Sequence, residues 1–289
     1  MTTTADSTST ETFTDDWRRW HAGHEQRRAD PHGFLAITSR NWLTPEPARF
    51  ADAPGAWRAD ESGVTVELRP DEELTLDGAV IRGTHNFGRI PERGGVFPHD
   101  GSAVYEVARR GGNDILRPRH PDSPVLAAYR GTPVYEPDPR WVVRGRYVPF
   151  ATPRDTSVGS VVEGLRHVYT APGVQEFTLN GETFRLTAFN GKEPGSFLVL
   201  FTDATSGVTT YAANRSLAIE PPDESGNVVI DFNRAVNLPC AYTTFATCPL
   251  PPEGNHLTVP VEAGEKTPEL SRGGVNSYRV YRLPWHSID

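Results

Sequence analysis

Beyond its N-terminal region, the chain is dominated by apolar and polar residues that alternate at a period of two. Residues 64–68 read Val-Thr-Val-Glu-Leu, the pattern of a strand that buries one face. Residues 177–186 contain two such alternating arms around Asn180-Gly181, a dipeptide that readily supplies both positive-φ positions of a two-residue turn. The alternation therefore predicts a β-hairpin over 177–186, with its turn at Asn180-Gly181.

Continuous apolar runs predict further strands with both faces buried. Residues 197–201 read Phe-Leu-Val-Leu-Phe, and residues 227–232 are similar, which is typical of strands enclosed in a core. Residues 74–81 hold a second hairpin signal at Asp77-Gly78. The fold class predicted is mainly β, with strand-rich antiparallel sheets in a sandwich or barrel-like arrangement. Other strand candidates lie at 103–109, 113–117 and 141–149.

One helix is predicted, close to the N-terminus. Asp15 and Asp16 stand where acidic side chains favour a helix start, and Trp17 and Trp20 are three residues apart, a helical spacing. We expect this helix over about residues 15–29. Glycine and proline, 26 of each, interrupt the rest of the chain, and no amphipathic pattern there runs far enough to predict a second long helix.

Changes in composition divide the chain into four segments. Residues 1–13 are rich in threonine and serine and offer little to bury, so we expect a disordered tail. Prolines cluster between residues 118 and 139, which indicates a boundary near residue 138. The segments after the tail are an N-terminal helix and β subdomain over 14–138, a C-terminal β subdomain over 139–266 and a C-terminal extension over 267–289.

Charge and hydropathy exclude several classes of protein. Hydrophobic residues make up 37% of the 289 and the net charge is −8, values of an ordinary globular protein. The acidic balance argues against general nucleic-acid binding. No stretch approaches the roughly 18 apolar residues of a membrane-spanning helix, and the start of the chain lacks the basic and apolar regions of a secretion signal. We therefore expect a cytoplasmic protein that binds neither nucleic acid nor membrane.

Polar side chains concentrate in residues 201–266, at the ends of predicted strands and in the loops that follow. Three of them are candidate catalytic residues, Asp203, Asp231 and Cys240, because a carboxylate or a thiol can act as a base or a nucleophile. Loops held by a rigid scaffold commonly carry function, so these groups form a site if the strand ends bring them to one cleft. Candidate substrate-binding residues of the same segment are Tyr211, Arg215, Asn233, Tyr242 and Asn255.

The same residues also admit a purely structural interpretation. Asp203 and Asp231 can cap turns or pair with Arg215 or Arg234, and such pairs hold adjacent loops in register. In the catalytic interpretation, burial raises the pKa of one carboxylate while the other stays ionised beside an arginine. A thiolate at Cys240 would instead need a histidine as its base, brought near by the fold.

The spacing of cysteines and histidines matches no common metal site. Cys240 and Cys248 are the only cysteines, and we expect free, buried thiols, because a reducing cytoplasm disfavours a disulfide and zinc needs about four ligands. Only His21 and His24 share a spacing that one helix face could use, and we interpret them as solvated helix residues. No metal and no cofactor are predicted. The histidines that the fold could bring to Cys240 are His85, His167 and His256.

An ordered series of motifs runs through the C-terminal half of the chain: Thr205-Ser206-Gly207, Thr210-Tyr211, Arg215-Ser216-Leu217, Asp231-Phe232-Asn233, Cys240-Ala241-Tyr242, Cys248-Pro249-Leu250-Pro251-Pro252 with Asn255, and Ala263-Gly264-Glu265. On these motifs the chain resembles a widespread bacterial and archaeal domain family of unknown function. The resemblance covers about residues 14–266, including Asn41-Trp42-Leu43, and it implies no catalytic residues. Leu238 stands where the family usually has proline, and residues 267–289 extend beyond the similar part.

Together these observations favour a small-molecule enzyme, a hydrolase or another acid–base catalyst, with its site in the loops of 201–266. The alternative is a non-catalytic β module that binds a small ligand or a protein through the same loops. A third hypothesis gives residues 267–289, with Tyr278, Tyr281 and Trp285, a role in a homo-oligomer. The residues alone leave the reaction and the substrate open.

Overall fold

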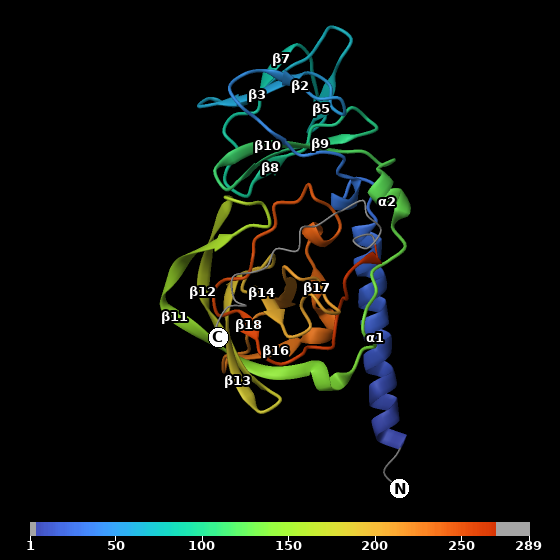
Figure 1. The fold of residues 1–289 in the computed structure, drawn as a ribbon, viewed down its shortest axis with the longest axis vertical. Helices are drawn as coiled ribbons and strands as arrows, with labels where there is room; N and C mark the ends of the chain where they lie inside the picture. Colours follow the sequence, from blue (N-terminus) through green and yellow to red (C-terminus); the bar gives the residue numbers. More distant parts are fainter. Residues whose placement is uncertain (1–3, 270–289) are drawn as a thin grey trace. The chain divides into compact units, whose positions relative to one another are not determined.

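The computed structural model describes residues 4–269, with side chains from residue 11 onward. The chain forms two compact units. Unit 1 comprises the N-terminal residues up to Glu25, Arg130–Tyr242 and the chain from Cys248 onward, and unit 2 comprises Gln26–Tyr129 and Thr243–Thr247. Figure 1 shows the elements of both units in the colours of the sequence. Unit 1 thus joins most of the N-terminal helix to the segment that carries the polar motifs.

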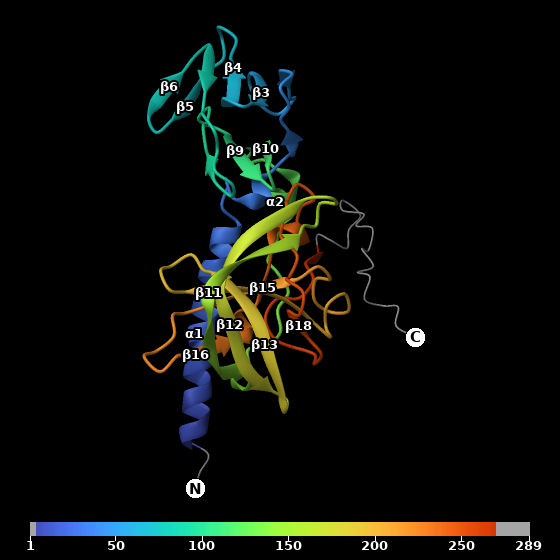
Figure 2. The same ribbon diagram turned by 90° about the vertical axis from the view of Figure 1, so that its left-hand side faces the viewer.

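Unit 1 is built around an eight-stranded sheet. Its order is β16-β11-β12-β13-β14-β15-β17, with β18 paired to β14. The β14–β18 pair is parallel and the others are antiparallel. The sheet curves into a half-barrel, in which β11, β12 and β13 lie side by side (Figure 2). The elements of this unit after the helix are η2 (Pro139–Trp141), β11 (Val142–Gly159), β12 (Arg166–Leu179), β13 (Glu182–Asn190), β14 (Phe197–Asp203), β15 (Arg215–Ile219), β16 (Asn227–Asp231), η3 (Phe232–Arg234), β17 (Val236–Asn237), η4 (Pro239–Ala241) and β18 (His256–Leu257).

The central hairpin of this sheet follows the turn chemistry of its sequence. The β12–β13 pairing continues to Leu179 opposite Glu182, and the turn places Asn180 at φ 50° and Gly181 at φ 82°. The predicted hairpin over 177–186 is therefore confirmed. Its inward-facing residues join those of the neighbouring strands in one apolar core, which includes Phe177, Phe184, Leu186, Phe197, Val199, Phe201, Leu217, Ile230 and Phe232.

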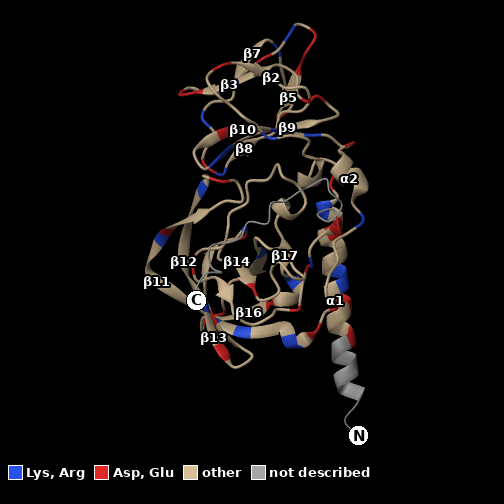
Figure 3. Cartoon of the chain, viewed as in Figure 1, with Lys and Arg blue, Asp and Glu red and all other residues tan. Residues whose placement is uncertain are grey.

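Helix α1 (Thr4–Arg28) is anchored to unit 1 through Trp17. This side chain is buried, and its Nε1 donates a 2.8 Å hydrogen bond to the main-chain oxygen of Asn233. Acidic and basic residues follow one another along the described part of the helix (Figure 3). The helix begins at Thr4, so residues 4–13, which we expected as a disordered tail, extend it. Extending a helix already held by packing adds a main-chain hydrogen bond with each residue.

Unit 2 consists of small antiparallel sheets with the orders β1-β10-β9-β8, β2-β3-β4-β7 and β5-β6. Its core surrounds the fully buried Trp57, Leu74 and Leu116. With both units strand-rich, the predicted fold class is confirmed: mainly β, antiparallel sheets and an N-terminal helix. Its elements are η1 (Phe34–Ala36), β1 (Asn41–Trp42), β2 (Ala48–Arg49), β3 (Ala56–Asp60), β4 (Gly63–Glu67), β5 (Leu74–Leu76), β6 (Ala79–Ile81), β7 (Thr84–Asn86), β8 (Gly95–Val96), β9 (Val104–Arg110), β10 (Asn113–Arg119) and α2 (Pro124–Ala128).

Within residues 4–269, no helix is both long enough and apolar enough to cross a membrane. The homo-oligomer hypothesis depends on Tyr278, Tyr281 and Trp285, which lie outside the described residues. It therefore stays a prediction.

Candidate functional site

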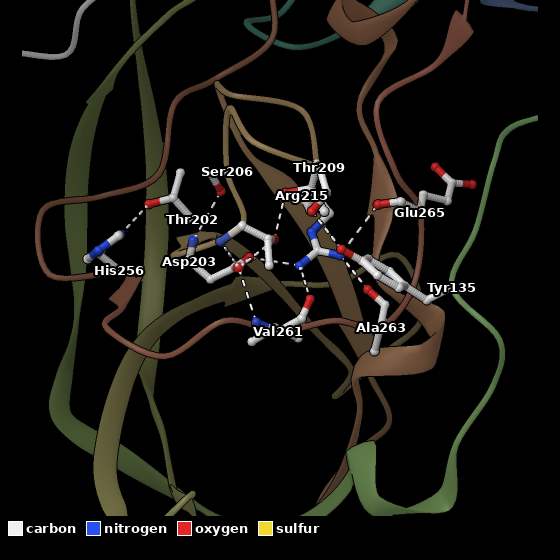
Figure 4. Close-up of polar contacts among 12 residues, drawn as sticks. Tyr135, Thr202, Asp203, Ser206, Thr209, Arg215, His256, Val261, Ala263 and Glu265 are labelled. Carbon is white, nitrogen blue, oxygen red and sulfur yellow. Dashed lines mark hydrogen bonds and ion pairs between the residues drawn. The ribbon is translucent and has the colours of Figure 1, made fainter.

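Asp203, the last residue of β14, forms an ion pair with Arg215, the first residue of β15. Oδ2 of Asp203 accepts a 2.7 Å hydrogen bond from Nη2 of Arg215, and both side chains are buried. Oδ1 accepts hydrogen bonds from Thr205 N at 2.7 Å, Thr205 Oγ1 at 2.6 Å and Val261 N at 3.2 Å. Figure 4 shows Asp203 with Arg215 and Val261. Both oxygens of this carboxylate are thus engaged in the interior, as the structural interpretation expects.

Arg215 also ties the 261–265 loop to the sheet. Its guanidinium donates hydrogen bonds to the main-chain oxygens of Val261 at 3.1 Å, Ala263, and Glu265 at 3.4 Å. A guanidinium carries five N–H donors in a rigid fork, so one buried arginine can hold several carbonyls and a carboxylate together. The pair of Asp203 and Arg215 therefore determines the path of the backbone that carries Glu265.

Asp231 and Asn233 form the junction between β16 and η3. Oδ1 of Asp231 accepts hydrogen bonds from Asn233 N at 3.0 Å and Asn233 Nδ2 at 2.8 Å, and its Oδ2 lies 3.2 Å from Nε of Arg234. The Asn233 amide also exchanges hydrogen bonds with the main chain of Asp138. Asp231 is partly exposed, but its contacts are those of a helix cap.

Cys240, in η4, lies beside Cys248, and both side chains are buried and form no disulfide. The main-chain N–H of Cys240 donates to Sγ of Cys248 at 3.3 Å, and the Tyr211 hydroxyl donates to the Cys240 carbonyl at 3.0 Å. Burial, and after it the adjacent Cys248 thiol, raises the pKa of Cys240 well above its ordinary value. The reactive species is the thiolate, so the raised pKa argues against a nucleophilic role. His256, one histidine considered as its base, contacts Thr202 at 2.9 Å.

Asn255 joins two strands of the sheet. Its Nδ2 donates to the carbonyls of Thr187 at 2.9 Å and Leu200 at 2.8 Å, and its Oδ1 accepts from Thr187 N at 2.8 Å. The side chain is buried. It completes hydrogen bonding between β13 and β14, which is a structural use of an amide that we considered for substrate binding.

Tyr242 contacts a second group of polar side chains, which includes Glu265. Its hydroxyl donates to Oε2 of Glu265 at 3.3 Å and lies 2.8 Å from Oγ1 of Thr132. Glu265 in turn meets helix α1, where His24 Nε2 lies 3.3 Å from Glu265 Oε1. Tyr242 is thus the predicted substrate-binding residue that the structure connects to this second group.

His21, His24, Glu25 and Glu265 converge in unit 1, and we call them the α1–Glu265 cluster. His21 Nε2 lies 4.0 Å from Glu25 Oε1. One ligand atom from each of His21, Glu25 and Glu265 lies within 4.8 Å of the other two. The Glu265 side chain is 2% exposed, whereas that of His24 is 22% exposed and those of His21 and Glu25 are 19% exposed. A buried carboxylate therefore stands behind three side chains that reach solvent.

The backbone of the Ala263-Gly264-Glu265 motif places the Glu265 carboxylate. The Glu265 N–H donates to Ala235 O at 2.9 Å, and Glu265 Oε2 accepts a 2.6 Å hydrogen bond from Asn237 N. Gly264 has φ 73°, and a Cβ atom built there would lie 2.5 Å from Ala235 O. Only glycine combines this positive φ with so close an approach, which explains the glycine of the motif.

The histidines of the cluster are stacked on tryptophans of their own helix. The rings of Trp17 and His21 are 4.7 Å apart and nearly parallel at 9°, and those of Trp20 and His24 are 5.4 Å apart at 13°. Our interpretation of both histidines as solvated helix residues therefore differs from their partly buried positions. The four-residue spacing from Trp17 to His21, and on to Glu25, is the signal in the sequence that could have identified this face.

Comparisons with known proteins place the chain among uncharacterised relatives. DUF1684, described as a protein of unknown function, matches residues 127–266. An uncharacterised protein of Haloarcula marismortui, solved by solution NMR, is 32% identical, and the match covers 49% of this chain and 78% of that one with a TM-score of 0.42. No curated protein matches. The matched residues contain the whole series of motifs from Thr205 to Glu265. The chain belongs to the DUF1684 family of proteins of unknown function.

Proposed function

We propose that this protein is a small-molecule enzyme of the hydrolase type, with its site at the α1–Glu265 cluster. One observation carries the proposal: the partly exposed imidazole of His24 lies 3.3 Å from the buried carboxylate of Glu265. A carboxylate that holds one ring nitrogen fixes the orientation of an imidazole that moves protons. Hydrolysis requires such proton transfer between water, substrate and leaving group.

The surroundings of Glu265 support this role. Its Oε2 accepts hydrogen bonds from the main chain of Asn237 and the hydroxyl of Tyr242, so the carboxylate is held from its buried side. His24 is further positioned by its stacking on Trp20. A group held by packing and by a second layer of hydrogen bonds keeps the geometry that catalysis needs.

The proposal differs in its central residues from the site that we expected. It keeps Tyr242 and the end of the 201–266 segment, where Glu265 lies. It leaves out Asp203 and Cys240, because the first is fully engaged with Arg215 and its neighbouring loop, and burial raises the pKa of the second. Asp231 is left out because it caps η3.

The test is a panel of ester, amide and phosphate-ester substrates, assayed with the full chain and with His24→Gln. We expect turnover of at least one class, reduced about 100-fold or more in the variant, the usual contribution of a positioned acid–base group. The matched control is His256→Gln, because His256 is an exposed histidine paired with Thr202, and this variant should keep full turnover.

Turnover that His24→Gln retains would contradict the proposed site. Binding of a panel compound without turnover would contradict the enzyme and favour the non-catalytic binding module. Thermal unfolding of both variants, followed by circular dichroism, separates loss of chemistry from loss of fold.

A further inference from the structure

Two carboxylates and an imidazole approach each other in the α1–Glu265 cluster. Glu25 and Glu265 come from distant parts of the chain, yet one carboxylate oxygen of each and one ring nitrogen of His21 all lie within 4.8 Å of one another. Two carboxylates at this range repel each other unless a positive charge or a proton lies between them. The cost is greater here because Glu265 is buried, where the dielectric constant is lower.

We propose that His21, Glu25 and Glu265 bind a divalent cation of the zinc class. The inference deepens the proposed function, because it names a cofactor for the same cluster. It also departs from our sequence prediction of no metal, which considered His21 and His24 without the distant Glu265.

The placement of the three ligands suits a cation. His21 and Glu25 are four residues apart on α1, so they share one face of the helix, and Glu265 approaches that face from the 261–265 loop. Zinc bonds to nitrogen and oxygen are roughly 2.0–2.2 Å long, so ligand atoms around one ion lie about 3.0–3.5 Å apart. Small side-chain rotations would bring atoms now within 4.8 Å to that spacing.

Neighbouring groups hold each ligand in place. Glu25 Oε2 accepts a hydrogen bond from Thr132 N at 3.2 Å, and Glu265 Oε2 accepts one from Asn237 N at 2.6 Å. The His21 ring is stacked on Trp17. Outer contacts of this kind orient metal ligands and raise the affinity of the site.

The donor set indicates the class of metal. One imidazole nitrogen with two carboxylate oxygens favours a first-row transition ion or zinc over Mg²⁺ or Ca²⁺, which prefer oxygen alone. His24 Nε2, 3.3 Å from Glu265 Oε1, is within reach of the same ion as a fourth ligand or as a partner of its bound water. A protonated imidazole at His21 or His24 is the alternative to a metal ion as the source of positive charge between the carboxylates. The experiment below distinguishes the metal ion from the protonated imidazole.

The test uses the full chain, stripped with a chelator and dialysed, and titrated with Zn²⁺ alone by isothermal calorimetry. We expect one equivalent to bind per chain, with the affinity reduced about 100-fold or more in His21→Gln and in Glu25→Gln. The matched control is Glu11→Gln, an exposed carboxylate on the same helix, which should bind Zn²⁺ as the original chain does. Mg²⁺ should not compete at equal concentration.

A second readout reports on the location of the ion. Because Trp17 is stacked on His21, Zn²⁺ should change tryptophan fluorescence in the original chain, and this change should be lost in His21→Gln and in Glu25→Gln, in which calorimetry is expected to show weakened binding. Circular dichroism of each variant shows whether the helix is retained. Glu265 is not substituted because its contacts also hold β17 and the loop.

Failure of the chain to bind Zn²⁺ stoichiometrically would overturn the inference. It would favour a protonated imidazole as the positive charge between the two carboxylates. Binding that His21→Gln and Glu25→Gln both retain would overturn it as well. The substrate panel reports separately on the proposed function. Turnover that persists after chelation would support the proposed hydrolase and show that its reaction needs no metal ion. Zn²⁺ binding without turnover would support the metal site and contradict the proposed hydrolase.

Discussion

Among single residues, Glu106 of β9 shows how a buried charge is accommodated in unit 2. Its carboxylate is buried against Arg110 at 3.2 Å, and against Arg117 and Arg119. Burial by itself would raise the pKa of Glu106, but Arg117 and Arg119 more than offset it and lower the pKa to about 2 from 4.5. The ionised carboxylate therefore stabilises the folded chain.

The lowered pKa of Glu106 predicts that the stability of the folded chain depends on pH. Because the pKa is lower in the folded chain, the contribution of Glu106 is complete above about pH 4.5 and is lost as the pH falls through about 2. The shift corresponds to roughly 3 kcal/mol. We expect Glu106→Gln to lower the free energy of unfolding by about this amount at pH 7, measured by urea denaturation.

The difference between Glu106→Gln and the original chain should shrink as the pH falls toward 2. The control is Glu67→Gln, an exposed carboxylate of the same unit, which should change stability by less than about 0.5 kcal/mol. An equal loss at pH 7 and pH 2.5 would show that Glu106 acts through packing and not through its charge.

At the scale of elements, turns with positive φ were the most predictable features. Asn180-Gly181 predicted its hairpin because the dipeptide itself supplies the backbone angles and both arms alternate. The predicted strand over 197–201 lies within β14, since a continuous apolar run of that length suits a strand enclosed in a core. The N-terminal limit of α1 was not predicted, because threonine and serine carry no strong helix signal.

Two glycines allow the effect of a positive φ on stability to be distinguished from the effect of a steric contact. Gly264 and Gly254 both have positive φ, but a Cβ atom at Gly264 would lie 2.5 Å from Ala235 O, whereas one at Gly254 meets nothing within 4 Å. We expect Gly254→Ala to lower the free energy of unfolding by about 1 kcal/mol, because of the positive φ alone. Gly264→Ala should lower it by about 2 kcal/mol more than Gly254→Ala does, because its Cβ atom also meets Ala235 O. Thermal or urea unfolding measures both values.

Gly264→Ala should also weaken Zn²⁺ binding, because it displaces the backbone that carries Glu265. Gly254→Ala should leave binding unchanged. Equal stability of the two variants would mean that the 261–265 loop moves aside without cost.

At the scale of the whole molecule, the ion pair of Asp203 with Arg215 connects β14, β15 and the 261–265 loop. Removing one partner of a buried ion pair leaves the other charge uncompensated, which lowers the free energy of unfolding by about 3–5 kcal/mol. We expect Asp203→Asn to lower the free energy of unfolding by about 3 kcal/mol, measured by urea denaturation, and to weaken Zn²⁺ binding through the loop.

Asp231→Asn provides the comparison for that variant. Asp231 is partly exposed and caps η3, so its substitution should cost about 1 kcal/mol and leave Zn²⁺ binding unchanged. Similar losses for the two variants would contradict the difference in burial on which this prediction depends.

The sequence by itself determined the local features of this protein: strand periodicity, hairpin turns, an N-terminal helix and the residues rich in polar chemistry. These are encoded within short windows, because side-chain period and turn angles depend on neighbouring residues. The partners of Asp203, Cys240 and Asn255 were decided by tertiary structure. So was the meeting of His21 and Glu25 with Glu265, because it depends on how α1 docks against a loop at the other end of the chain, and no local pattern records that contact.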